Sequence, residues 1–294
     1  KPAWPLRREL YAHGGSIYPP RRPLAPARLA MAAGLALACG DNPMTVRYAW
    51  RRRLQRLARR IVAMSPDLVV VGDTFLADLA PLLKGKVPRL LIDTHNVESR
   101  LPRRVGRESR NPVTKLRCAA EAAYLEGMER RLLPLADQVW AVSDDDARHY
   151  REVLGLGNVL VVPNVLDMAR YPVPDLPPPA VPTVVFCGWF RHWPNEDAAV
   201  KLIAHSRRLA ERGVTHDLVL VGRDPTPAMA AAAEGMAQVT ITGEVPDVAP
   251  YIGGATVFAA PIAAGSGTKL KVLEAMALER AVLTTEVGAE GLYL

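Results

Sequence analysis

The sequence predicts an α/β protein built from two parallel sheets with helices on their faces. Three observations support this fold class. Short apolar runs of strand length alternate with helix-length segments along most of the chain, as in parallel sheets with helical crossovers. The alternation stops at residues 171–182, where six prolines form a stiff linker, and then begins again. The 294 residues, 49% of them apolar, are enough for two domains of ordinary size.

The first half, residues 1–174, begins with an irregular stretch rich in Pro and Arg. Arginines and apolar residues interleave at helical spacing at 45–63, which predicts a helix there. Short apolar runs and the segments between them predict strands at 67–72, 89–93, 138–142 and 158–162, and helices at 74–83, 115–135 and 143–153. The Arg-rich segment 100–111 is expected to be a mobile loop.

The second half, residues 175–294, repeats the pattern. Strands are predicted at 183–187, 217–221, 239–243, 255–260 and 281–285, and helices at 195–212, 248–253 and 269–278. Ligands of open parallel sheets bind beyond the carboxyl ends of the strands. The candidate site therefore consists of the segments that follow four of these strands, namely 188–195, 222–223, 243–245 and 265–271.

The last of these segments is a Gly-rich loop that joins a buried strand to a helix. Gly265 and Gly267 allow tight turns and leave room for a ligand close to the main chain. Thr268 is expected to cap the helix, whose free N–H groups favour an anion together with Lys269. Such a loop suits a diphosphate, with a hydroxyl-rich group on Glu274. An ordinary strand-to-helix turn with a solvated Glu is the alternative.

Charge and cysteine content narrow the class of partner only slightly. The net charge of +7 permits a nucleotide, a phospholipid or a nucleic acid and selects none of them. The seven arginines between Arg47 and Arg60 suit either a basic face for anionic lipid or a solvated surface helix. No DNA- or RNA-binding motif accompanies the charge, so nucleic acid is not expected. Three widely spaced cysteines predict a reducing compartment without disulfides.

The stretch GSGTKLKVLEAM at residues 265–276, continued to Gly291, resembles the C-terminal donor site of GT-B glycosyltransferases. It looks most like the retaining family 4, in its bacterial exopolysaccharide-type branch. In outline, the resemblance covers residues 67–291. It implies two Rossmann-like domains facing a cleft: an acceptor-side domain at 1–174, incomplete at its start, and a nucleotide-sugar donor domain at 175–294, incomplete at its end. The chain is thus expected to be an internal fragment.

The resemblance also implies an activity. The protein would be a retaining hexosyltransferase that moves a sugar from a nucleotide-diphosphate-sugar to a hydroxyl, in cell-surface polysaccharide or glycolipid synthesis. Its partners would be the nucleotide sugar and a glycan or lipid-linked acceptor. It would be cytoplasmic, and peripheral at the inner face of the plasma membrane through residues 47–60. A nucleotide-sugar 2-epimerase of the same fold and a non-catalytic nucleotide-binding remnant are the alternatives.

The resemblance assigns roles to single residues. Arg191 would bring a guanidinium to the donor diphosphate, with a surface Arg as the alternative. Glu274 would accept hydrogen bonds from the ribose. Ser266 stands where many relatives carry a Glu that contacts the donor sugar, so Lys271 would supply charge there instead. His95, which follows the 89–93 strand, would lie near the transferred sugar, or would be a structural His bonded to a neighbouring carboxylate.

The predicted site residues are thus His95, Arg191 and Lys271 as catalytic groups, and Gly188, Arg223, Gly243, Glu244, Gly265, Ser266, Gly267, Thr268, Lys269 and Glu274 as donor-binding groups. The run Asp144-Asp145-Asp146 looks like the metal-binding motif of the other glycosyltransferase fold. With Ser143 before it, the run is better explained as the start of a helix. We expect no metal and no cofactor, because positive protein groups would carry the charge of the leaving diphosphate.

Overall fold

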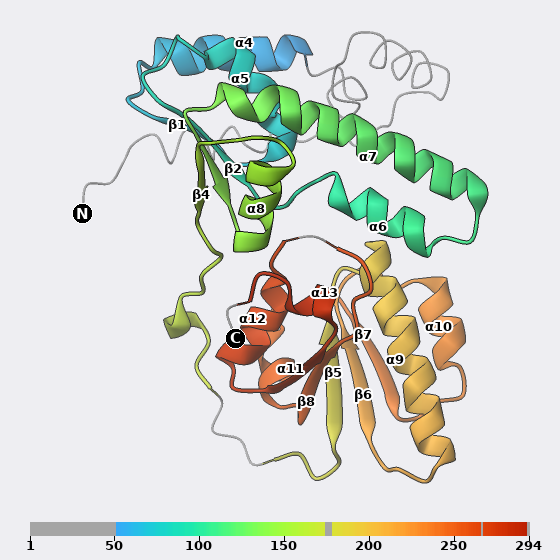
Figure 1. Ribbon diagram of the computed structural model, residues 1–294. Helices are drawn as coiled ribbons and strands as arrows, with labels where there is room; N and C mark the ends of the chain where they lie inside the picture. The colour runs from blue at the N-terminus through green and yellow to red at the C-terminus, as the bar shows by residue number, and fades with distance from the viewer. Residues whose placement is uncertain (1–50, 174–177, 266, 293–294) are drawn as a thin grey trace. The chain divides into compact units, whose positions relative to one another are not determined.

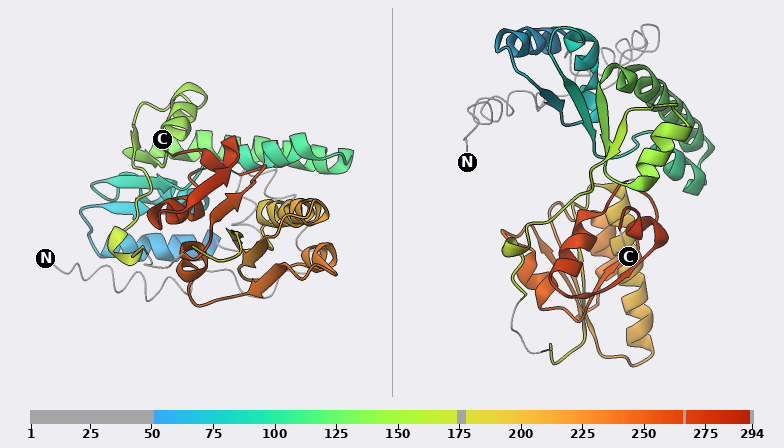
Figure 2. Two further views of the ribbon diagram at one scale, coloured as in Figure 1. Left: turned by 90° about the horizontal axis from the view of Figure 1, so that it is seen from below. Right: turned by 60° about the vertical axis from the view of Figure 1, so that its left-hand side comes forward.

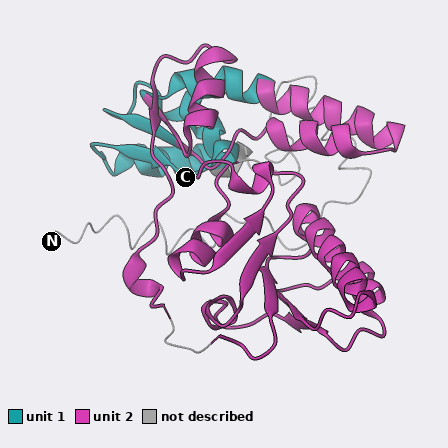
Figure 3. Ribbon diagram, turned by 60° about the horizontal axis from the view of Figure 1, so that its bottom comes forward, with its two compact units in different colours: residues 1–92, 127–137 teal, residues 93–126, 138–294 magenta. Residues whose placement is uncertain are grey.

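The computed structural model describes residues 51–173, 178–265 and 267–292, without the side chains of residues 51–53 (Figure 1). Arg47 and Ser266 therefore lie outside the described residues. The chain divides into two compact units: unit 1 holds Lys1–Ile92 and Gly127–Asp137, and unit 2 holds Asp93–Glu126 and Gln138–Leu294 (Figure 3). The domain border near residue 175 stays a prediction.

Unit 1 contains the parallel strands β1 (Val69–Val71) and β2 (Leu90–Thr94), the latter ending in unit 2, with Val70 opposite Leu91. Helix α4 (Arg51–Ala63) packs on α5 (Ala80–Leu83) and buries Leu54 and Ala58. The helix predicted at 74–83 is present, but its first part is the 3₁₀-helix η1 (Thr74–Leu79), whose N-terminus is capped by Asp73. No described helix is long and apolar enough to cross a membrane.

Along the chain, β2 is followed by the helices α6 (Arg100–Glu108), α7 (Pro112–Leu132) and α8 (Asp144–Glu152) and by the 3₁₀-helices η2 (Leu133–Leu135) and η3 (Met168–Arg170). The strands β3 (Gln138–Ala141) and β4 (Val159–Val161) in the same part of the chain pair in parallel. The predicted start of α8 is confirmed, because Ser143 Oγ accepts a hydrogen bond from the Asp146 N–H at 3.1 Å. The predicted mobile loop at 100–111 is wrong: most of it is α6. Three of its arginines form ion pairs with acidic residues outside the helix, which stabilises it.

The second sheet has the order β7-β6-β5-β8-β9, and all its strands are parallel. The strands are β5 (Thr183–Cys187), β6 (Asp217–Val221), β7 (Val239–Gly243), β8 (Val257–Ala260) and β9 (Ala281–Thr284). The predicted bounds of β5, β6 and β7 are confirmed to the residue. Phe186, Phe190 and Phe258 are fully buried and form the aromatic centre of the core.

Helices cover both faces of this sheet. They are α9 (Trp193–Glu211), α10 (Pro227–Ala233), α11 (Ala249–Gly253), α12 (Leu270–Ala277) and α13 (Glu286–Ala289). Helices α9 and α10 lie together on one face, and α11 and α12 on the other (Figure 2). The predicted Thr268 cap is wrong. Helix α12 has Lys269 at its N-cap without a side-chain hydrogen bond. Thr268 Oγ1 lies before the cap and donates to the Gly291 carbonyl at 3.5 Å.

Candidate functional site

The strand order defines a switch point between β5 and β8. The chain proceeds from β5 outward to β6 and β7, and from β8 in the opposite direction to β9. Connections that leave two neighbouring strands in opposite directions leave a crevice at their carboxyl ends, which is where open α/β sheets bind ligands. The loops that begin at Gly188 and Pro261 flank this point.

Three of the four predicted loops are joined by backbone hydrogen bonds. The Gly188 N–H donates to the Val221 carbonyl at 2.9 Å, and the Gly222 N–H donates to the Gly243 carbonyl at 3.1 Å. Gly222 has φ +147°, and a Cβ on it would lie 1.8 Å from the Gly188 carbonyl oxygen. Only glycine fits there, because any side chain would push the β5 and β6 loops apart.

Lys271 lies against the Gly188 loop. Its Nζ donates to Asn195 Oδ1 at 2.7 Å and sits 4.7 Å from the centre of the Phe186 ring. Asn195 is oriented by its own bond from Nδ2 to the Trp189 carbonyl at 2.9 Å. A Cβ on Gly188 would come within 3.0 Å of both side chains. Burial lowers the pKa of Lys271 to about 8, so this ammonium is poorly solvated and would be stabilised by an anion.

The same loop carries His192, which is not among the predicted site residues. Partial desolvation and the charge of Lys271 both lower the pKa of His192, so its neutral form is favoured beside the lysine. The sequence signal for His192 was its position inside the predicted 188–195 segment. Arg191 has an exposed side chain next to it, and its predicted contact with a diphosphate stays a prediction.

Arg223 borders the first loop from the end of β6. Its guanidinium carbon lies 4.7 Å from the Trp189 ring centre, a cation–π contact, and the Phe190 N–H donates to the Arg223 carbonyl at 3.1 Å. Trp189 in turn donates from Nε1 to Asp224 Oδ2 at 2.8 Å. Glu244 follows β7 directly and is exposed.

The Gly-rich loop adopts the left-handed backbone that its glycines predict, with φ +156° at Gly265 and +66° at Gly267. Lys269 Nζ donates to the Gly267 carbonyl at 2.6 Å, and burial lowers the pKa of Lys269 to about 8. A Cβ on Gly267 would lie 2.6 Å from the His95 carbonyl oxygen and 2.8 Å from Asn96 Oδ1. The structure thus brings the His95 segment to this loop within unit 2. The His95 side chain is exposed.

Glu274 has a partner that no sequence motif indicates. The Tyr171 hydroxyl, from the Pro-rich segment, donates to Glu274 Oε1 at 3.1 Å. Desolvation and the nearby carboxylate raise the pKa of Tyr171, so the phenol stays a donor. No local pattern marks a tyrosine 103 residues away from its acceptor.

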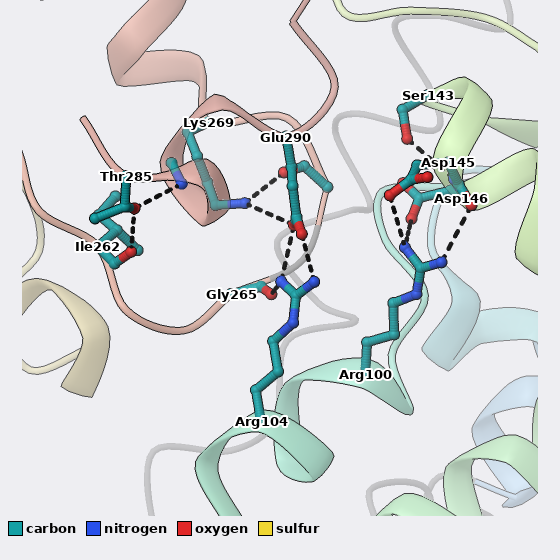
Figure 4. Close-up of polar contacts among 12 residues, drawn as sticks. Arg100, Arg104, Ser143, Asp145, Asp146, Ile262, Gly265, Lys269, Thr285 and Glu290 are labelled. Atoms are coloured by element: carbon teal, nitrogen blue, oxygen red, sulfur yellow. Dashed lines mark hydrogen bonds and ion pairs between the residues drawn. The ribbon is translucent and has the colours of Figure 1, made fainter. Parts of the chain in front are cut away.

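The acidic residues at the start of α8 are paired with the guanidinium of Arg100 (Figure 4). Arg100 donates to Asp146 Oδ1 and to the Asp145 carbonyl, each at 3.1 Å. Burial raises the pKa of Asp146, which is 1% exposed. Among the described residues, no group of three or more His, Cys, Asp or Glu side chains has an arrangement that would hold a metal.

Residues 181–292 match the family model for Glycosyl transferases group 1. This match includes all the site residues except those of the His95 segment and Tyr171. A comparison with curated proteins gives no match.

Solved structures resemble the chain over about four fifths of its length. The UDP-forming α,α-trehalose-phosphate synthase from Burkholderia vietnamiensis is 15% identical, with a TM-score of 0.60 over 83% of this chain and 66% of that one. HepE of Anabaena in complex with UDP-glucose is 15% identical, with a TM-score of 0.55 over 81% and 65%. TarM is 11% identical, with a TM-score of 0.62 over 80% and 44%.

At these identities the likeness shows the fold alone, which is GT-B with two Rossmann-like α/β regions. The chain spans less than two thirds of the length of each of these three structures.

Proposed function

We propose that the chain is the core of a glycosyltransferase that moves a sugar from a nucleotide-diphosphate-sugar to a hydroxyl acceptor, with retention of configuration. The observation that carries the proposal is the cluster at the β5–β8 switch point, inside the segment that matches the family model. There the poorly solvated ammonium of Lys271 lies beside Gly188, and the Gly-rich loop precedes it in the chain. One of the similar structures, HepE, is a complex with UDP-glucose, so UDP-glucose is the first donor to test.

The chemical task is to stabilise the negative charge that develops on the departing diphosphate. Lys271 supplies a positive charge whose pKa would rise from about 8 on contact with phosphate, so it stays protonated at neutral pH. The first N–H groups of α12 add a partial positive charge, and preorganised donors of this kind give large stabilisation in a dry site. These groups would replace a metal ion. Glu274 would hold the ribose, sharing its carboxylate with Tyr171.

The reaction test is incubation of the chain with UDP-glucose and other nucleotide sugars, with and without simple acceptors. Transfer, or slow hydrolysis that releases free nucleoside diphosphate, is the expected result, and loss of this activity in a Lys271→Met variant would link it to the site. Isomerised nucleotide sugar would support the epimerase alternative. Binding without any turnover would support the remnant.

We also propose that a cell-surface glycan or lipid-linked acceptor is reached at an anionic membrane. On α4, Arg56, Arg59 and Arg60 have exposed side chains. The arginines of α6 contribute less than the sequence suggests, because three of them are ion-paired. Each exposed basic residue near an anionic leaflet contributes about 1 kcal/mol, which salt screens.

A second basic surface lies at the start of α7, where the exposed apolar side chains of Val113 and Leu116 have exposed fractions of 73% and 74%. Exposed Lys115 and Arg117 flank them, and Arg110 precedes them. Apolar residues ringed by basic ones are typical of interfacial membrane contacts. The test is co-sedimentation with phosphatidylglycerol vesicles at low and high salt. Leu116→Glu should reduce binding, whereas Val165→Glu, at an apolar position with an exposed fraction of 82%, should not. Salt-independent binding, or equal loss in both variants, would contradict the proposal.

A further inference from the structure

We propose that Arg104 and Glu290 form a positioning clamp that holds Gly265 and the 267–269 segment of the Gly-rich loop in the arrangement that receives the donor diphosphate. The proposal rests on the function proposed above and names two positioning residues that are not among the predicted site residues. Arg104 comes from α6, in the segment expected to be a loop, and Glu290 follows α13 near the end of the described chain.

The contacts of Arg104 are those of a fork holding a carboxylate and a loop carbonyl (Figure 4). One terminal nitrogen donates to Glu290 Oε2 at 2.8 Å and also to the Gly265 carbonyl oxygen, and the other donates to Glu290 Oε1. Bidentate pairs of this kind fix both position and orientation. Both side chains are mostly buried, with exposed fractions of 24% and 21%, so the pair is less screened than one on the surface.

Glu290 also faces the other end of the loop. Its Oε2 lies 3.8 Å from Lys269 Nζ, which itself donates to the Gly267 carbonyl at 2.6 Å. One carboxylate thus balances two cations, and each cation holds one glycine carbonyl. Carbonyl oxygens repel an incoming diphosphate. Hydrogen bonds from Arg104 and Lys269 to the Gly265 and Gly267 carbonyls reduce this repulsion.

A loop with two glycines needs such restraint. Glycine loses more backbone freedom on ordering than any other residue, and both loop glycines have positive φ. Arg104 acts through the loop, because three of the five N–H donors of its guanidinium are directed at Glu290 and Gly265. Without Glu290, the two neighbouring cations would repel each other, and Lys269 would lose the larger of the two carboxylate contributions that raise its pKa.

The chain contains a matched control on the same helix. Arg103, one residue away on α6, forms an ion pair with Glu126 of α7. This partner lies on a neighbouring helix and not on the Gly-rich loop. Arg103→Gln and Arg104→Gln therefore remove the same charge from the same helix, and only the second releases the loop.

The experiment measures UDP and uridine affinity by titration calorimetry for the parent chain and for Arg103→Gln, Arg104→Gln, Glu290→Gln and the Arg104→Gln/Glu290→Gln double variant. We expect UDP affinity to fall about tenfold in each single clamp variant, the size of one charge-assisted hydrogen bond, and no further in the double variant. Uridine lacks the diphosphate, so its affinity should not change. Arg104→Lys, which keeps the charge but loses the fork, should restore part of the UDP affinity.

Hydrogen exchange of residues 262–270 without nucleotide supplies a second readout. Faster exchange in Arg104→Gln than in Arg103→Gln is expected. Unchanged UDP affinity and unchanged exchange in Arg104→Gln would overturn the clamp, as would equal losses for UDP and uridine. A parent chain that binds neither UDP nor GDP would contradict the proposed function, and the exchange comparison would then still decide whether the clamp orders the loop.

Discussion

Replacing Lys271 by Met should stabilise the ligand-free protein while weakening its binding of UDP. The lysine amine lies under the Gly188 loop, bonded to Asn195 and stacked on Phe186. Desolvation is the largest cause of its lowered pKa, so the charge opposes folding. Met keeps the length and apolar character of the side chain and removes the charge.

The magnitude follows from the pKa. Burial lowers the pKa of Lys271 from 10.5 to about 8, which corresponds to about 3 kcal/mol against the charged form. The lost bond to Asn195 returns about 1 kcal/mol. The variant should therefore be more stable by about 2 kcal/mol at pH 7. Binding of UDP should weaken by about 1.5–3 kcal/mol, because a hydrogen bond to a charged group is lost.

The pH dependence has a fixed sign. Because the folded-state pKa of Lys271 lies below its unfolded value, folding favours the neutral amine, and the cost of the charge is fully present below about pH 8. That cost disappears as the pH rises from about 8 to 10.5. The stability advantage of Lys271→Met should shrink over this window. Lys269, whose pKa is also lowered by burial, is present in both proteins.

Thermal and urea unfolding at pH 7 and pH 10, with calorimetric titration of UDP at pH 7, measure these effects. The control is Lys201→Met on α9, whose exposed ammonium pairs with Asp197 at 2.7 Å. It should change stability by less than about 1 kcal/mol and leave UDP affinity unaltered. A Lys271→Met variant that is less stable than the parent by the same amount at both pH values would refute the reasoning.

Three further predictions follow from the same site. Glu274→Gln should weaken nucleotide binding by about 1–3 kcal/mol, since a charged acceptor is lost, and unchanged affinity in calorimetry would argue against the ribose role. Transfer activity should survive EDTA. Complete loss that Mg²⁺ or Mn²⁺ restores would instead assign a metal to residues 144–146. Gly222→Ala should cost several kcal/mol and lower the melting temperature, because its Cβ would lie 1.8 Å from the Gly188 carbonyl oxygen. Gly213→Ala, also at positive φ but with open space around it, should cost only about 1 kcal/mol, and equal costs would contradict the packing argument.

Strands with uniform apolar character were predictable because their signal is local. The run Thr183–Cys187 is mostly apolar, contains three β-branched residues and is followed by Gly188, so its bounds follow from the chain alone. Helix α6 was not predictable in this way. Its arginines repel one another within the helix, and the acids that compensate them, such as Asp146 and Glu290, lie far along the chain. Helix α10 was not predicted either, because it is mostly alanine and shows no apolar stripe.

The candidate site divides along the same line. The four strand-end loops were predictable, because the carboxyl ends of parallel strands must share one edge of a sheet. The positive φ values at Gly265 and Gly267 were also predictable, since tight turns need glycines. Tyr171, Arg104 and Glu290 were not, because each acts on a partner that only the folded chain brings near. His192 lay within a predicted loop, but its proximity to Lys271 depends on how that loop folds.

A crystal structure of the chain grown with UDP tests the central claim most directly. We expect the diphosphate at the β5–β8 switch point, with Lys271 Nζ within hydrogen-bond distance of a phosphate oxygen and the ribose at Glu274. UDP bound elsewhere on the chain, or a diphosphate that leaves Lys271 bonded only to Asn195, would contradict it.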